Sequence, residues 1–157
     1  MKPVYSEIII FAPADLVWSV IADPDLYPEW NPFTPRISLK TKELAVGTEF
    51  DLDCQMTEET LLRGEMEVVL EVNPHERRFR MGTSRTRGRP GIRSNRCQTC
   101  SPTANNCTKY VNFEEFTGLL SPIVYLIYSS KLEHAFDRHN RALKARSEAL
   151  YAAQKNN

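Results

Sequence analysis

The feature that most constrains the fold of this chain is a long stretch of helical spacing at residues 118–154. Ser121 is at an N-cap position and Pro122 at the first helical position, where the missing N–H group costs nothing. Apolar or small residues then recur with helical period at Leu119, Ile123, Leu126, Ser130, Phe136, Asn140, Leu143, Ser147 and Leu150. Such a helix is on the order of 45 Å long, so we expect it to cross a whole sheet.

The middle of the chain has the two-residue period of an antiparallel sheet with one packed face. Apolar residues alternate with polar ones in four successive segments, at Ile37 and Leu39, at Phe50, Leu52, Cys54 and Met56, at Met66, Val68, Leu70 and Val72, and at Phe79 and Met81. Turn residues separate these segments and leave two more strands near residues 92–100 and 107–117. We therefore expect six antiparallel strands in this region.

The N-terminal region has a strand, a helix and a short aromatic segment. Residues 4–11 contain a β-branched run, and residues 12–21 have helical spacing that ends at Asp23-Pro24. The closely spaced prolines that follow allow at most one short helical turn, and this segment carries Trp30 and Phe33. A curved sheet wrapped around the long helix would bury that helix at two places and leave a gap between them.

Length and composition indicate one globular domain, residues 1–157, with 41% hydrophobic and 25% charged residues. No apolar run is long enough to span a bilayer and no signal peptide is recognisable, so we expect a cytoplasmic location. The four cysteines are then expected to be reduced thiols.

Charge is distributed unevenly although the net charge is zero. Residues 77–113 contain eight arginines and Lys109 but no acidic residue. The part from residue 77 to residue 96 could contact an anionic head group or membrane surface. Phe79 is the aromatic residue among these arginines, so base stacking is poorly supported and we expect no nucleic-acid partner.

The segment APADLVWSVIADPDLYPEWNPF, residues 12–33, resembles the opening of the SRPBCC or START-like superfamily. The similarity continues at residues 46–48, in TKYVNFEEFTGLL at 108–120, and in the NRALK motif at 140–144 with Glu148. This resemblance implies an α+β helix-grip fold of about seven strands around a C-terminal helix, with two short helices after strand one. It also implies a cavity for a small hydrophobic molecule such as a lipid, quinone, polyketide or aromatic compound. IRSNRCQTC, residues 92–100, is more polar than the corresponding strand of that family.

The candidate site consists of apolar and polar residues on the walls of this expected cavity. Its apolar members are Trp30, Phe33, Phe50, Leu52, Phe79, Met81, Leu120 and Val124, and its polar members are Arg96, Gln98, Asn112 and Glu114. Hydrophobicity alone favours Val111 and Phe113 inward on the last strand, whereas the resemblance favours Asn112 and Glu114. Either face of residues 92–100 is polar, so we expect a cavity with a polar end and an apolar end.

Three function classes remain open: a binder of a small hydrophobic molecule, an enzyme of cyclase or dehydratase type, and an adaptor that docks on a membrane or partner. In the enzyme, Glu114 would be the general acid or base and Asn112 its orienting partner, because burial raises the pKa of a carboxyl group. Cys97 and Cys100 lack a second ligand pair, and His134 and His139 lie about 140° apart on a helix. We expect no metal and no cofactor.

Overall fold

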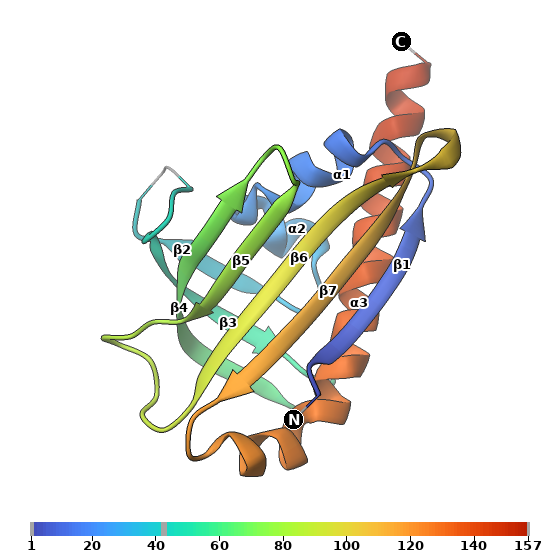
Figure 1. Ribbon diagram of the computed structural model, residues 1–157. Coiled ribbons are helices and arrows are strands. Elements are labelled where there is room, and N and C mark those ends of the chain that lie inside the picture. Colours follow the sequence, from blue (N-terminus) through green and yellow to red (C-terminus); the bar gives the residue numbers. More distant parts are fainter. Residues whose placement is uncertain (1, 42–43, 157) are drawn as a thin grey trace.

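The computed structural model describes residues 2–41 and 44–156. Within these residues the strands are β1 (Val4–Ile10), β2 (Arg36–Leu39), β3 (Glu49–Gln55), β4 (Leu61–Asn73), β5 (Arg78–Thr83), β6 (Arg93–Thr103) and β7 (Cys107–Thr117). They form one antiparallel sheet in the order β1-β7-β6-β5-β4-β3-β2 (Figure 1). The first strand of the chain therefore pairs with the last, and the remaining strands form a meander.

The helices cover the inner face of this curved sheet (Figure 1). Between β1 and β2 lie α1 (Ala14–Ile21), the 3₁₀ turn η1 (Pro24–Leu26) and α2 (Tyr27–Trp30), whereas the 3₁₀ turn η2 (Ala104–Asn106) joins β6 to β7. The long helix α3 (Ser121–Lys155) follows β7 and runs along the sheet. The expected helix-grip architecture is confirmed, including the two short helices after the first strand.

The part of α3 from Leu132 onward contributes to the core together with α1. Its buried side chains include Leu132, Ala135, Phe136, His139 and Leu143. Two polar residues of α3 also contact β1, since Asn140 Nδ2 donates to Ser6 Oγ at 2.9 Å and Ser6 Oγ donates to an Asp137 carboxylate oxygen at 2.5 Å. This part of the helix packs against the sheet as its apolar spacing predicted.

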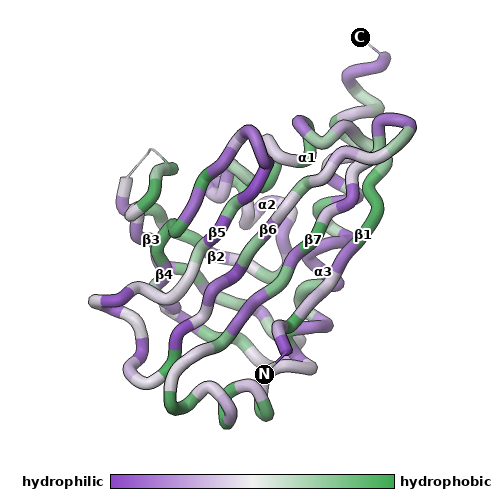
Figure 2. The backbone as a smooth tube through the Cα atoms, in the orientation of Figure 1, coloured by the Kyte–Doolittle hydropathy of each residue, from purple (hydrophilic) through white to green (hydrophobic). Residues whose placement is uncertain are grey.

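The first half of α3 differs from the sequence-based expectation. Leu119, Ile123 and Leu126 were expected to begin the buried face, but they are 92%, 58% and 84% exposed. In Figure 2 the segment that leads from β7 into α3, at one end of the molecule, includes stretches coloured as hydrophobic. The first turns of α3 have two apolar stripes, of which the one with Val124 and Tyr128 faces the interior, so a helical period alone did not reveal which stripe is covered. The N-cap is Leu120, not Ser121, whose hydroxyl donates instead to the Gly118 carbonyl at 2.7 Å.

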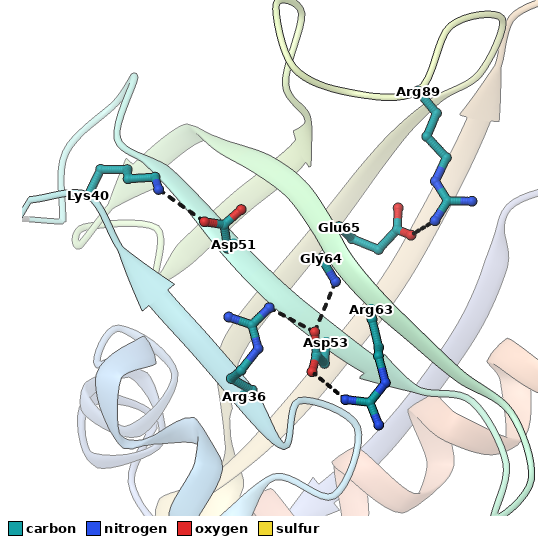
Figure 3. Close-up of polar contacts among 8 residues, drawn as sticks. All are labelled: Arg36, Lys40, Asp51, Asp53, Arg63, Gly64, Glu65 and Arg89. Carbon is teal, nitrogen blue, oxygen red and sulfur yellow. Dashed lines mark hydrogen bonds and ion pairs between the residues drawn. The ribbon is translucent and has the colours of Figure 1, made fainter.

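Strand β4 contains two register irregularities that decide which of its side chains face inward. Opposite β3, the pairs Leu52↔Glu65 and Cys54↔Leu62 leave an extra β4 residue at Gly64, whose φ is +65°. The Gly64 N–H donates to Asp53 Oδ1 at 2.9 Å, and Asp53 also pairs with Arg36 at 2.8 Å (Figure 3). A second shift lies between Val69 and Glu71 on the β5 side.

These irregularities correct the expectation for β4. Met66 and Val68 were expected to present an apolar inner face, but Glu65 and Glu67 lie directly opposite the buried Leu52 and Phe50. Residues opposite each other in an antiparallel pair share one face of the sheet. The inner positions of this part of β4 are therefore acidic, although Met66 still borders the interior.

Candidate functional site

A cavity lies between the inner face of the sheet, the first half of α3 and the loop that joins β5 to β6. Its volume is about 180 Å³, and an apolar cavity of about 150 Å³ holds a molecule as large as benzene. Its apolar lining includes Phe33, Leu52, Met56, Phe116, Val124 and Leu132. The exposed residues Arg87 and Arg89 border it from the loop, so this side forms the mouth. The cavity can enclose a small ring system.

Four charged side chains border the same cavity from three strands. Glu65 and Glu67 come from β4, Arg96 from β6 and Glu114 from β7. Arg96 and Glu114 are directly opposite each other in the β6–β7 ladder and are 3% and 7% exposed. The inward orientation of Asn112 and Glu114, favoured by the resemblance, is therefore the one observed. One wall of the cavity is polar and the rest is mainly apolar.

Arg96 is held by one hydrogen bond and two aromatic rings. Its Nε donates to Asn112 Oδ1 at 2.9 Å, and its guanidinium carbon lies 4.9 Å and 4.6 Å from the ring centres of Phe33 and Phe136. Stacking on aromatic faces stabilises a buried guanidinium. Within the described residues Arg96 forms no ion pair, and its Nη2 has no hydrogen-bond partner. This nitrogen is therefore available to a molecule in the cavity.

Burial raises the pKa of the Glu114 carboxyl group, and the nearby Arg96 charge offsets part of that rise. Burial likewise raises the pKa of Glu67, with repulsion from Glu114 adding to it, to about 8. Both groups face a cavity that contains one buried cation, Arg96, among the described residues. The carboxyl pair can consequently hold a proton near neutral pH and donate it as a hydrogen bond.

A second polar group lies deeper in the core, beyond the cavity. The Tyr110 hydroxyl donates to Gln98 Oε1 at 2.6 Å and lies 2.9 Å from His139 Nε2. If the tyrosine proton goes to Gln98, His139 Nε2 carries the proton of the second bond. Burial holds the pKa of His139 well below its usual range, so this imidazole is neutral. The ring of Trp30 lies 5.4 Å from that of His139.

The structure brings part of the predicted site together. Of the twelve predicted binding residues, those that line the cavity are Phe33, Leu52, Arg96, Glu114 and Val124.

The other predicted residues lie away from the cavity lining. Phe50, Phe79 and Met81 fill the core, and Leu120 is 46% exposed at the start of α3. Gln98 and Trp30 belong to the deeper group around His139, and Asn112 accepts a hydrogen bond from Arg96. These seven residues are not among the lining residues of this cavity, and their role as ligand contacts stays a prediction.

Several lining residues were missed by the sequence analysis. Tyr128 and Leu132 follow Val124 at intervals of four, so helical spacing from Val124 could have identified them. Phe116 follows Glu114 by two residues and could have been found in the same way. No comparable signal pointed to Glu65 and Glu67, because the bulge at Gly64 changes which β4 side chains face inward.

The described residues also bear on metal binding, membrane spans and the state of the cysteines. Among residues 2–41 and 44–156, no cluster of three or more His, Cys, Asp or Glu side chains is arranged to hold a metal ion. No helix in this part of the chain is long and apolar enough to cross a membrane. The four cysteines are free thiols, with Cys54, Cys97 and Cys100 buried.

Comparison with known families gives a match over residues 1–148 to the family described as polyketide cyclase / dehydrase and lipid transport. The chain belongs to this family. No protein with a curated description matches the sequence. The match covers both the sheet and most of α3, and it agrees with the resemblance inferred from the residues.

Solved structures support the family fold at low sequence identity. The Zhui aromatase/cyclase from a Streptomyces species has 17% identity and a TM-score of 0.74, with 94% of this chain and 93% of that chain covered. Norcoclaurine synthase from Thalictrum flavum has 17% identity and a TM-score of 0.69, covering 92% and 84%. A START superfamily protein from Mycobacterium smegmatis has 15% identity and a TM-score of 0.69, covering 94% and 98%. These similarities establish the fold of the chain.

Proposed function

We propose that this protein binds a small, mostly apolar molecule that carries an oxygen-bearing head group. The apolar body would lie against Phe33, Leu52 and Phe116, and the head group would reach the polar wall formed by Arg96, Glu67 and Glu114. The family includes proteins described as polyketide cyclases, dehydrases and lipid-transport proteins, which supports a ligand of this general class.

The observation that carries this proposal is a pair of buried polar atoms without partners. Arg96 Nη2 and Glu67 Oε2 border the cavity, and neither has a hydrogen-bond partner among the described residues. A buried polar group left unpaired costs about 1–3 kcal/mol, and more if it is charged. A carbonyl or carboxylate oxygen would accept from Arg96, while a ligand hydroxyl would pair with Glu67. One head group with both features would satisfy both atoms.

The test compares naphthol with methylnaphthalene, two ligands of similar size that differ by a hydroxyl in place of a methyl group. Affinities of wild type and Arg96→Leu are measured by fluorescence competition. We expect wild type to prefer naphthol and Arg96→Leu to lose roughly tenfold or more of its naphthol affinity, since a hydrogen bond to a charged group contributes about 1.5–3 kcal/mol. The affinity for methylnaphthalene should change much less.

Arg80→Leu is the matched control, because Arg80 lies opposite Cys97 on the other face of the sheet and does not line the cavity. This variant should bind both ligands as wild type does. Equal losses for naphthol and methylnaphthalene in Arg96→Leu would contradict the proposed head-group contact.

The raised pKa of Glu114 supports a second candidate, a cyclase- or dehydratase-type enzyme. In this candidate, the Glu114 carboxylate removes a C–H proton next to a ketone, and that carbon bonds to a second carbonyl carbon. The second carbonyl oxygen takes up a proton, and one water then leaves with loss of a further C–H proton, so no oxidant is required. Asn112 would act indirectly, by holding Arg96 beside this carboxylate.

This candidate is tested with a linear diketone able to close a six-membered ring, by following water loss with mass spectrometry. Glu114→Gln should retain naphthol binding within about threefold while losing turnover, because Gln keeps the shape but cannot transfer the proton. Turnover that is unchanged in Glu114→Gln would eliminate the proposed acid–base role. Binding without turnover in the wild type would support the binding protein alone.

A further inference from the structure

The beginning of α3 carries an apolar face that the described residues leave largely exposed. We define the α3 apolar face as Leu119, Leu120, Ile123, Leu126 and Ile127, which are 92%, 46%, 58%, 84% and 52% exposed. Helical residues three and four apart lie on one side of a helix, so Ile123, Leu126 and Ile127 form one stripe, and Leu119 and Leu120 lie in the turn that leads directly into it. Isolated exposed leucines are ordinary, but a contiguous apolar patch marks an interaction site.

The same helical turns have a second apolar stripe that faces the cavity. Val124 and Tyr128 line the cavity, and they lie about 160–200° around the helix from Leu126. Packing inside the protein therefore explains why positions 124 and 128 carry large apolar side chains. It does not explain the apolar side chains of Leu126 and Ile123. Residues 118–130 also contain no charged side chain.

Arginines border this apolar face from the β5–β6 loop. The Leu120 N–H donates to the Gly91 carbonyl at 2.9 Å, so the loop is fixed to the start of α3. We define the arginine segment as residues 85–93, which contain Arg85, Arg87, Arg89 and Arg93 and no acidic residue. Arg87 and Arg89 pair with Glu49 and Glu65 at 4.0 and 2.5 Å. Within the described residues, Arg85 and Arg93 form no ion pair, and both are exposed.

We propose that the α3 apolar face and the arginine segment together dock on an anionic lipid bilayer. Apolar side chains would enter the boundary between head groups and acyl chains, while the arginines would contact lipid phosphates and carboxylates. Neither element suffices alone, because a single apolar patch or a few basic residues gives weak, reversible attachment. The hydrogen bond between Leu120 and Gly91 holds the two elements next to each other, so apolar insertion and electrostatic attraction act at the same end of the molecule.

Charge favours a bilayer over a second copy of this chain as the occupant. A two-fold interface on the α3 apolar face would bring the arginine segments of both copies toward each other, and no acidic residue of either segment would compensate. An anionic bilayer is complementary to the arginines and to the apolar stripe. Docking at this end would also turn the cavity mouth toward the membrane, because Arg87, Arg89 and Ile92 border that mouth. The docking proposal does not depend on the identity of the cavity ligand.

The experiment is cosedimentation of the full chain with vesicles of phosphatidylcholine alone and of phosphatidylcholine mixed with phosphatidylserine. Leu126→Asp disrupts the apolar stripe, and the double variant Arg85→Gln/Arg93→Gln removes two unpaired charges. Val46→Asp and Arg141→Gln are the matched controls. Val46 is 68% exposed in the segment between β2 and β3, and Arg141 is exposed about 21 Å further along α3 than Ile127 and forms no ion pair within the described residues. Thermal melts verify that each variant is folded.

We expect wild type to bind the phosphatidylserine vesicles, to bind phosphatidylcholine vesicles much more weakly, and to be released by added salt. The double arginine variant should lose roughly ten- to thirtyfold in affinity, since each basic residue contributes about 1 kcal/mol near an anionic surface. Leu126→Asp should lose at least about tenfold, because a charge replaces a membrane-buried side chain. Both controls should bind like wild type.

Absence of wild-type binding, or equal binding to both vesicle types, would overturn the proposal. Wild-type affinity in a folded Leu126→Asp variant would overturn it as well. Analytical ultracentrifugation measures the oligomeric state of both proteins. A wild-type dimer that dissociates in Leu126→Asp would identify the α3 apolar face as a contact between copies and overturn the bilayer proposal.

Discussion

Arg96 is the residue that most determines the electrostatics of the cavity. It is 3% exposed, it lies opposite Glu114, and its charge lowers the pKa of both Glu67 and Glu114. The aromatic rings of Phe33 and Phe136 replace part of the solvation that burial removes. A cation and two carboxyl groups with raised pKa values therefore coexist in one apolar enclosure, where their protonation depends on the pH and on the ligand.

The first prediction concerns the stability of Glu67→Gln as a function of pH. The folded state raises the pKa of Glu67 to about 8 from an ordinary value of 4.5. Between these values the folded protein keeps a proton that the unfolded chain releases, so this residue makes the wild type less stable as pH rises. The glutamine side chain of the variant cannot ionise, so the free energy of unfolding of the variant lacks this decrease with pH. The variant should gain at least about 1.4 kcal/mol relative to wild type between pH 5 and pH 8, the equivalent of one pKa unit.

Urea denaturation at several pH values measures this difference, and Glu58→Gln in an exposed loop is the control. The control should stay within about 0.5 kcal/mol of wild type at every pH, as surface substitutions usually do. A Glu67→Gln difference that is independent of pH would show that the Glu67 carboxyl group has no raised pKa.

At the scale of single elements, α3 contains two leucines with opposite environments. Leu143 is fully buried in the core, whereas Leu126 is 84% exposed on the α3 apolar face. Leu143→Ala should lower the free energy of unfolding by about 2–5 kcal/mol, because it removes buried surface and leaves a cavity. Leu126→Ala should change it by no more than about 0.5 kcal/mol. Chemical denaturation of both variants measures the contrast, and comparable losses would mean that the first half of α3 is packed.

The elements themselves could be predicted well from the sequence. Strand alternation, turn residues and the helical period of residues 118–154 give seven strands and a long C-terminal helix in the observed order. The resemblance correctly favoured Glu114 inward, although hydrophobicity favoured Val111 and Phe113. The site was harder to predict where the local period breaks. Around Gly64 and Leu70, irregular register places Glu65 and Glu67 inward, a reversal that a period-two pattern cannot show.

The start of α3 shows a second limit of periodicity. A helix can have two apolar stripes, and the spacing of Ile123 and Leu126 does not say whether a sheet covers them. Coverage depends on which side of the helix the sheet faces, which is a property of the assembled fold. The same applies to Trp30 and Gln98, whose polarity and size were recognised but whose contacts with His139 and Tyr110 arise from distant segments.

At the scale of the whole molecule, the sheet and α3 enclose a cavity with a polar wall, an apolar wall and a mouth bordered by the exposed Arg87 and Arg89. Leu143 and His139 hold the later part of α3 in the core, whereas the first turns line the cavity through Val124 and Tyr128. Different residues therefore stabilise the fold and line the cavity, because the residues that hold the helix are distinct from most of those that face the cavity. Ligands should therefore contact the first half of the helix.

The central claim is that this cavity is the ligand-binding site, and methyl NMR spectra recorded during a naphthol titration test it most directly. Binding in the cavity should shift the methyl signals of its lining residues Leu52, Met56, Leu62, Val124 and Leu132. Signals from Val46, Leu70 and Leu126, which are exposed and do not line the cavity, should stay unchanged. Shifts confined to the exposed methyl groups, or no saturable shift in the lining residues, would contradict the account.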